Sequence, residues 1–314
     1  MKKIIPTVLA VLTVISLMVV GLFHGIVLDD LQKETLLILV IICGSSALYC
    51  FVIGEITHNN SQMDKLWSIL PMVYMWIIAI KGGMSARLTV MAILVTIWGI
   101  RLTLNFARKG AYSIKFWTGK EDYRWSILRR NPLLKSRITW AIFDLFFISI
   151  IQNALVLGIC LPGVALMSSA EPFSAMDYVA TVLMLFFIIY ETIADFQQYL
   201  FQTKKYQLLK AAKELKNLPS PYNLGFNTHG LFAISRHPNY FAEQAIWVCF
   251  YLFTIGAKVT FYGVFNWSIV GCLFLVILFI GSSTMGESIS ASKYPEYASY
   301  QKRIAKYFPL PWKK

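Results

Sequence analysis

Charged residues are scarce in this sequence of 314 residues: they make up 14% of it, whereas hydrophobic residues make up 57%. Apolar runs of about 20 residues, the length that crosses a bilayer, recur along the chain. This composition is typical of an all-α polytopic membrane protein. We also find no internal repeat, low-complexity tract or long linker, so residues 1–314 are expected to form a single membrane domain.

The sequence lacks the signatures of metal sites, Rossmann nucleotide sites and nucleic-acid-binding sites. The five cysteines all lie in apolar segments, without a CxxC pair, and the four histidines form no i, i+4 pair, so the sequence predicts no metal site. No GxGxxG turn follows a strand, which excludes a Rossmann nucleotide site. The basic stretches match no nucleic-acid-binding motif, and nucleic acid is therefore not an expected partner.

The apolar runs predict seven to eight transmembrane helices, with edges uncertain by about 2 to 4 residues. The expected spans are residues 4–24, 36–54, 65–82, 87–107, 138–165, 178–201, 239–257 and 264–284. The first of them, preceded by Lys2 and Lys3, has the composition of either a signal peptide or a retained helix. The missing cleavage pattern before His24 favours retention.

Basic residues outnumber acidic ones by 29 to 16, a formal net charge of +13. Lys and Arg concentrate in residues 108–137, in residues 203–237 and in the C-terminal tail, whereas Asp and Glu mark the loops 25–35 and 166–177. Because Lys and Arg near span ends resist translocation, this alternation predicts eight crossings with both termini in the cytoplasm. The positive net charge is explained first by membrane topology. The alternative explanation is that the cytoplasmic side binds an anionic ligand.

Two carboxylates interrupt the sixth expected span. Glu191 and Asp195 are four residues apart and would share one helix face. Since carboxylates facing lipid are costly, this face should look into the bundle or its cytosolic mouth. The alternative is a helix end that simply emerges into water.

The string SRHPNYFAE, residues 235–243, lies where a basic loop meets a late apolar segment. Pro238 marks a helix start, after which Asn239 and Glu243 share a face. Arg236 and His237 lie at the helix mouth, where free amides and the helix dipole favour anions. The string therefore indicates either a purely structural helix start or a site that binds phosphate and amide groups.

Three stretches resemble one known family. GLFAISRHPNYFAEQAIW at 230–247 resembles the signature of the steroid 5-alpha reductase C-terminal superfamily, in particular its bacterial branch of uncharacterised, DUF1295-like membrane proteins. ADFQQYLFQ at 194–202 and KYPEYASYQKRIAKYFPLPW at 293–312 resemble the elements that flank the signature. The resemblance is strongest over residues 190–312. Weaker similarity at 98–110 and 121–125 extends it over 64–314, with residues 1–60 as extra N-terminal helices.

The resemblance implies an internal NADPH chamber, open to the cytosol, in which a conjugated C=C bond of an enone is reduced. The lipophilic substrate would be steroid-like, an isoprenoid or another lipid, in a multi-pass protein of the bacterial inner (plasma) membrane. Carried over by position, the implied catalytic residues are Asp64 and Glu243. The implied cofactor-binding residues are Arg101, Glu191, Asp195, Arg236, His237, Asn239, Tyr240, Glu243, Tyr294 and Tyr297.

The sequence also departs from the family pattern. Steroid reductases hold the substrate ketone with a Glu and a Tyr, whereas Asp64 and Trp98 stand at the corresponding places here. A looser form of the motif occurs in isoprenylcysteine carboxyl methyltransferase, so S-adenosylmethionine-dependent methyl transfer is the alternative activity. A transporter or lipid-binding scaffold is the third possibility, although the sequence has no inverted halves or paired broken helices.

Overall fold

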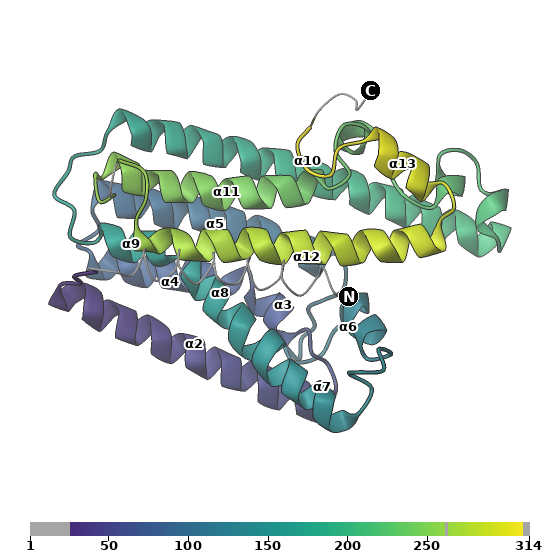
Figure 1. Ribbon diagram of the computed structural model, residues 1–314, viewed down its shortest axis with the longest axis horizontal. Coiled ribbons are helices and arrows are strands. Elements are labelled where there is room, and N and C mark those ends of the chain that lie inside the picture. Colours follow the sequence, from purple (N-terminus) through teal and green to yellow (C-terminus); the bar gives the residue numbers. More distant parts are fainter. Residues whose placement is uncertain (1–25, 261–262, 310–314) are drawn as a thin grey trace, which may run out of the picture. The chain divides into compact units, whose positions relative to one another are not determined.

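The computed structural model describes residues 26–260 and 263–309, and their regular elements are helices. The chain divides into two compact units. The first unit comprises the described residues up to Thr181 together with Phe250–Phe274, and the second comprises Val182–Cys249 and the described chain from Leu275. The helices α10 (Ala175–Ala212), α11 (Pro238–Gly256) and α12 (Val270–Lys293) each run unbroken from one unit into the other (Figure 1).

The first unit is built mainly from helices that precede α10. They are α2 (Asp30–Thr57), α3 (Gln62–Leu66), α4 (Ile69–Lys81), α5 (Ala86–Ala107), α6 (Tyr123–Leu128), α7 (Arg137–Phe143), the π-helix η1 (Asp144–Ile151), α8 (Gln152–Gly158) and α9 (Leu161–Leu166). The short η5 (Trp267–Ile269) leads into α12.

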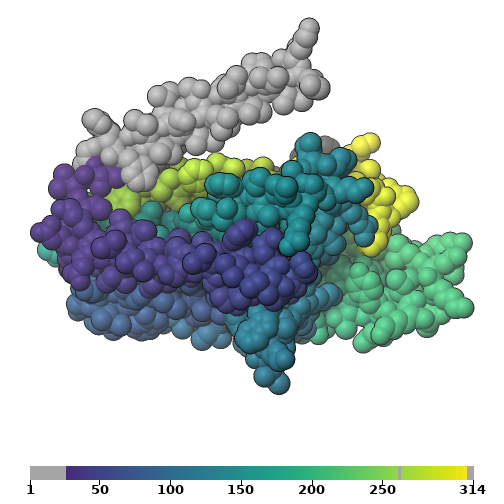
Figure 2. All heavy atoms as spheres, turned by 90° about the horizontal axis from the view of Figure 1, so that it is seen from below, coloured from purple at the N-terminus to yellow at the C-terminus, as the bar shows by residue number. Residues whose placement is uncertain are grey.

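The helix α2 begins with a capping box, in which Asp29 accepts from the backbone N–H of Gln32 and the Gln32 side chain accepts from that of Asp29. Its outer face is apolar and open, with Leu37, Leu48 and Ile56 each at least 60% exposed. Figure 2 shows α2, in dark purple, running along one face of the first unit. An exposed apolar stripe of this length fits contact with lipid acyl chains.

A buried ion pair joins the beginnings of α5 and α10 within the first unit. The Nε and Nη2 of Arg87 lie 2.8 Å from the two carboxylate oxygens of Asp177, and both side chains are at most 5% exposed. Arg87 also donates to the carbonyls of Glu171 and Pro172. These bonds satisfy the guanidinium inside the protein, which is the condition under which a buried pair is tolerated.

The segment from α7 to α8 is continuous but changes its helical type, because η1 widens to π geometry between two α-helical stretches. Beyond it, Gly158 of α8 packs against Gly271 of α12, where a Cβ on Gly271 would stand 2.0 Å from the Gly158 carbonyl carbon. Small residues of this kind let the backbones of two membrane helices approach closely.

The second unit holds most of α10, α11 and α12 and the described part of the C-terminal tail. Between them lie the short helices η2 (Leu215–Asn217), η3 (Tyr222–Leu224), η4 (Gly230–Ala233) and α13 (Tyr297–Arg303). Its core includes an aromatic cluster of Phe226, Tyr294, Tyr297 and Tyr300. The hydroxyl of Tyr300 donates to the carbonyl of Phe232, so this cluster fixes the tail to the loop before the motif.

Among the described residues, five helices are long and apolar enough to cross a membrane: Asp30–Thr57, Ala86–Ala107, Arg137–Leu166, Ala175–Ala212 and Trp267–Lys293. They confirm five of the expected spans and the all-α membrane class. The expected span 65–82 is broken near Ser68, which leaves α4 with 13 residues. The expected span 239–257 forms α11, whose polar first turns set it apart from those five.

Residues 4–24 lie outside the described residues, and the count of seven to eight spans is not confirmed. The single domain, the cytosolic chamber and the orientation of the termini stay predictions.

Candidate functional site

The acidic face of α10 is buried within the second unit. Glu191 is 4% exposed and Asp195 is 7% exposed, whereas Ile189, Ile193 and Phe196 on the other side of the helix are 46–60% exposed. The helix thus turns its carboxylates toward protein and its aliphatic and aromatic side chains toward the surroundings. This orientation is the one that a carboxylate in a membrane span requires.

The helix α11 carries the other half of this site. The Nδ2 of Asn239 donates to Oδ1 of Asp195 at 3.2 Å, joining the two motifs that the sequence placed 44 residues apart. One turn later Glu243, 4% exposed, accepts from the indole N–H of Trp247 at 3.1 Å. The structure therefore brings Asp195 and Asn239 together and turns Glu243 inward, as the helical spacing predicts.

Arg236 and His237 converge on Glu287 of α12. The Nε of Arg236 lies 2.6 Å from Oε1 of Glu287, and Nε2 of His237 lies 3.0 Å from the same oxygen. Gln301 donates to the second oxygen at 3.1 Å. Arg236 also donates to the carbonyls of Gln301 and Ile304, so four of its five N–H groups are bonded within the protein.

The C-terminal tail runs alongside the beginning of the motif. The backbone N–H groups of Arg236 and His237 donate to the carbonyls of Ala305 and Lys306 at 2.9 and 3.0 Å. The hydroxyl of Ser235 donates to the carbonyl of Tyr307 at 2.7 Å. Arg236, His237 and Glu287 therefore act as a latch between tail and motif.

Aromatic rings complete the surroundings of the latch. The ring of Tyr240 stacks on His237 with centroids 5.4 Å apart and meets Phe279 edge-on at 4.8 Å. The hydroxyls of Tyr307 and Ser283 are hydrogen-bonded. Burial raises the pKa of Tyr307, and the bond to Ser283 offsets part of that rise. These contacts place Tyr240 beside the latch.

Tyr294 and Tyr297 belong to the aromatic cluster, at 9% and 5% exposure. Burial also raises the pKa of their neighbour Tyr300. Lys205, only 2% exposed, donates to the carbonyl of Gly225 and lies 5.7 Å from the ring of Tyr294. The cluster thus contains a buried cation that the motif did not indicate.

The remaining predicted residues belong to the first unit. Asp64 of α3 accepts from the indole N–H of Trp125 at 3.1 Å, with Arg124 at 4.0 Å. Burial raises the pKa of Asp64, and the positive charge of Arg124 offsets part of the rise. Arg101 is half-buried in α5. That Asp64 and Arg101 share a chamber with Asn239 stays a prediction.

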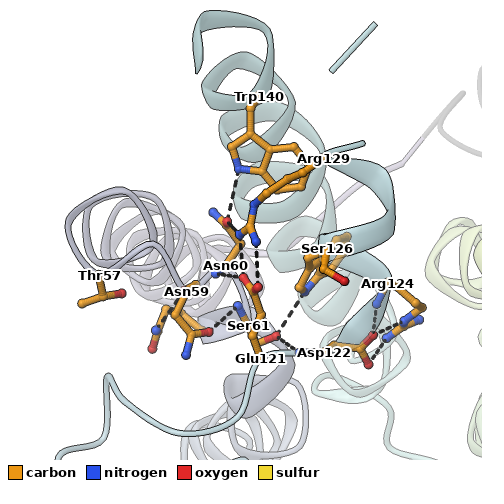
Figure 3. A network of polar contacts seen from close by, with 12 residues as sticks. Thr57, Asn59, Asn60, Ser61, Glu121, Asp122, Arg124, Ser126, Arg129 and Trp140 are labelled. Atoms are coloured by element: carbon orange, nitrogen blue, oxygen red, sulfur yellow. Dashed lines mark hydrogen bonds and ion pairs between the residues drawn. The ribbon is translucent and has the colours of Figure 1, made fainter. Parts of the chain in front are cut away.

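The segment around residues 121–125 forms a dense polar network with the loop that follows α2 (Figure 3). Arg129 donates to both oxygens of Glu121 at 2.6 and 2.7 Å and to Oδ1 of Asn60. The indole N–H of Trp140 donates to the same Asn60 oxygen at 3.2 Å. Sequence reasoning recorded this segment only as a weak similarity, because the partners in the network are far apart along the chain.

Glu287 is the main residue that sequence reasoning missed. The expected span ended at residue 284, three positions before this acid, and the sequence analysis did not single it out. The structure extends α12 to Lys293 and leaves Glu287 7% exposed. The available signal was a lone carboxylate near the end of an apolar run, in a chain that also has an Arg-His pair at a helix start.

Comparison with known proteins gives two findings. The family model described as "Protein of unknown function (DUF1295)" matches residues 50–304. The uncharacterized protein C594.04c of Schizosaccharomyces pombe is 36% identical over 282 residues, covering 83% of this chain and 78% of the yeast protein. No solved structure matches the chain.

Proposed function

Because the chain belongs to the DUF1295 family, within the steroid 5-alpha reductase-like group, we propose that it is an NADPH-dependent membrane reductase. Its substrate would be a lipophilic enone of steroid-like, isoprenoid or lipid type, reduced at the conjugated C=C bond. The observation that carries this proposal is the bonded pair of Asp195 and Asn239 with Glu243 buried one turn beyond it.

These three side chains fit a nicotinamide. Its carboxamide has an N–H donor and a carbonyl acceptor, which suit carboxylates and the amide of Asn239 respectively. When bound, NADPH would supply a hydride to the β-carbon of the enone, and a proton from solvent or an acidic side chain would add to the α-carbon. Asn239, Asp195 and Glu243 would hold and orient the nicotinamide end of the cofactor, with Glu191 one turn before Asp195 on the same buried face.

The phosphate end of the cofactor needs cations. Arg236 keeps one N–H outside the bonds that it makes to Glu287 and the tail, so it would contribute a single hydrogen bond to a phosphate. Lys302 and Arg303 are exposed on the last turn of α13 and would supply further charge. Basic side chains bind phosphate oxygens by charge-assisted hydrogen bonds.

Asp64 would assist the reaction at the substrate carbonyl. Negative charge gathers on that oxygen as hydride adds to the β-carbon, and a hydrogen-bond donor there lowers the barrier. Burial favours the protonated form of Asp64, because it raises the pKa of this side chain, and a protonated carboxyl is a donor. Trp98, fully buried in α5, cannot supply a proton in the same role.

The methyltransferase alternative rests on the latch. Since Glu287 and the tail hold four of the Arg236 N–H groups, the motif commits less positive charge to phosphates than its sequence suggests. S-adenosylmethionine carries no phosphate and would need less positive charge in its binding site. Ligand binding separates the two activities directly.

The test compares the thermal stability of detergent-purified protein with NADPH, NADH and S-adenosylmethionine. A ligand at about 100 times its Kd stabilises the folded state by about 2.7 kcal/mol, which is a measurable shift in Tm. We expect a shift with NADPH that is lost in Asn239→Ala and Glu243→Ala and kept in Gln244→Ala, a matched change on the same helix. A shift with S-adenosylmethionine alone would support the alternative, and an NADPH shift unchanged in the first two variants would contradict the assigned site.

A further inference from the structure

A second polar site lies inside the first unit, away from the motif. Asp144, the first residue of the π-helix η1, is 1% exposed, and neither of its carboxylate oxygens accepts a hydrogen bond of good geometry from the described residues, although the side chains of Asn60 and Ser149 lie close enough to interact with it. The Nδ2 of Asn60 and the hydroxyl of Ser149, both on buried side chains, likewise make no hydrogen bond of good geometry in the described part of the chain, and Asp144 is the group that both of them approach. Native proteins rarely bury such groups without a ligand or an ordered solvent molecule.

The orientation of the Asn60 side chain is fixed by its neighbours. Its Oδ1 accepts from Arg129 and from the indole N–H of Trp140, so a flipped amide would set its own N–H groups against two donors. The amide nitrogen must therefore point away from Arg129 and Trp140. The Asn60 side chain presents a donor to the interior of the unit.

Gly54 on α2 shows where that donor points. A Cβ built on Gly54 would stand 3.1 Å from Nδ2 of Asn60 and 3.2 Å from Oδ2 of Asp144. The amide and the carboxyl thus converge on the space over a residue that has no side chain. Gly54 itself is buried.

The π-helix brings a third group to the same side. In π geometry the chain makes its hydrogen bonds from i to i+5, so Ser149 follows Asp144 by one turn, and π turns recur at functional sites. One α-helical turn further, Asn153 donates its Nδ2 to the carbonyl of Ser149, and its Oδ1 has no partner among the described residues. Asp144, Ser149 and Asn153 form a polar file along a span whose other residues are mostly apolar.

The charges around Asp144 decide which ligand fits. Arg129 on the loop after α6 is a cation that acts on Asp144, and Glu121 already holds it by two bonds. Glu55 on α2 adds negative charge, and Cys50 is a further titratable neighbour on the same helix. A metal cation would meet the N–H donor of Asn60, whereas water can both accept from that amide and donate to the carboxyl.

We propose that Asp144, Asn60 and Ser149 form an internal site for water and a proton, in which Asp144 is a neutral carboxylic acid. An ionised carboxylate without bonded partners is expensive in the membrane interior, and protonation removes most of that cost. Hydrogen bonds of Asn60 connect the site to Arg129 and Glu121. It holds a proton within a membrane span independently of whether the protein reduces an enone.

Infrared difference spectroscopy of the protein in lipid membranes tests this proposal. A protonated carboxyl has a carbonyl stretch distinct from carboxylate bands, and this band moves when water is replaced by D2O. We expect such a band in the unmodified protein at neutral pH, its loss in Asp144→Asn and its retention in Asp30→Asn, a matched change at a fully exposed acid. A spectrum without the band, or a band that persists in Asp144→Asn, would overturn the proposal.

Two glycines of α2 provide a test that does not depend on folding of the Asp144 variant. Gly54→Ala fills the space between Asn60 and Asp144, whereas Gly44 has no atom within 4 Å of its built Cβ. We expect Gly54→Ala to shift the carboxyl band and to slow its exchange in D2O, and Gly44→Ala to leave both unchanged. Equal spectra for the two variants, or an increase in Tm with NaCl but not with choline chloride that requires Asp144, would reject a water site.

Discussion

Two buried acids in long apolar helices have opposite surroundings. Glu287 in the second unit accepts hydrogen bonds from Arg236, His237 and Gln301, whereas Asp144 in the first unit accepts none of good geometry from the described residues and faces the neutral side chains of Asn60 and Ser149. Burial alone therefore does not tell a structural acid from a functional one. The difference lies in whether the protein supplies the partners.

The largest effect is expected when the bonded acid loses its charge. Glu287→Gln leaves Arg236 and its guanidinium charge buried without a counterion, which costs about 3 to 5 kcal/mol. Thermal unfolding in detergent should show a large fall in Tm, and limited proteolysis should release the tail after residue 293. Glu296→Gln, a matched change on the exposed surface of the tail, should alter neither. A small effect at Glu287 would break the comparison between the two acids.

Removing the cation as well sharpens the same comparison. In the double variant Glu287→Gln, Arg236→Met no unpaired charge remains, so part of the stability lost in the single variant should return. We expect a coupling free energy of about 1 to 3 kcal/mol from the double-mutant cycle. Simple additivity of the two single changes would show that the latch contributes nothing as a pair.

Asp64 stands between the two extremes, with one indole N–H bond and an arginine at 4.0 Å. Because burial raises the pKa of Asp64, its cost to the folded state is absent at low pH and grows as the pH rises above the ordinary carboxyl range. Asp64→Asn should therefore gain Tm relative to the unmodified protein as the pH rises above the ordinary carboxyl range. Parallel Tm curves across that range would contradict a raised pKa.

The smallest effect on stability is expected at an acidic side chain that is exposed to water. Asp29 caps α2, and its bonds from the Ser168 hydroxyl and the Gln32 amide lower its pKa, so this contribution is lost as the pH falls through the carboxyl range. Asp29→Ala should cost about 1 kcal/mol near neutral pH. Asp29→Asn should retain most of the cap, because the amide oxygen still accepts. A larger loss for Asn than for Ala would exclude capping as the cause.

The sequence predicted the helices better than their internal breaks. Apolar runs define spans such as 36–54 and 87–107 because hydropathy is summed over many residues and tolerates local exceptions. The π-helix could not be found this way, since DLFFISII is as apolar as the α-helical stretch around it. The break near Ser68 depends on tertiary contacts, among them the hydrogen bond of Ser68 to Thr103.

The candidate site was predicted where its residues are close in sequence. The i, i+4 spacing of Asn239 and Glu243 predicted their shared inward face, and helical period did the same for Glu191 and Asp195. Glu287 and Asn60 were not found, because the arginine that each of them binds, Arg236 and Arg129 respectively, is more than 50 residues away along the chain. A single sequence does not show such pairings.

The crossing of Gly158 and Gly271 has a consequence for evolution of this chain. Since the opposing atoms at 2.0 Å belong to the backbone, no rotamer change can make room for even one methyl group at position 271. The two helices would have to part, exposing peptide groups to hydrocarbon. Position 271 should therefore admit glycine alone in any descendant that keeps this crossing, a restriction set by steric fit rather than by catalysis.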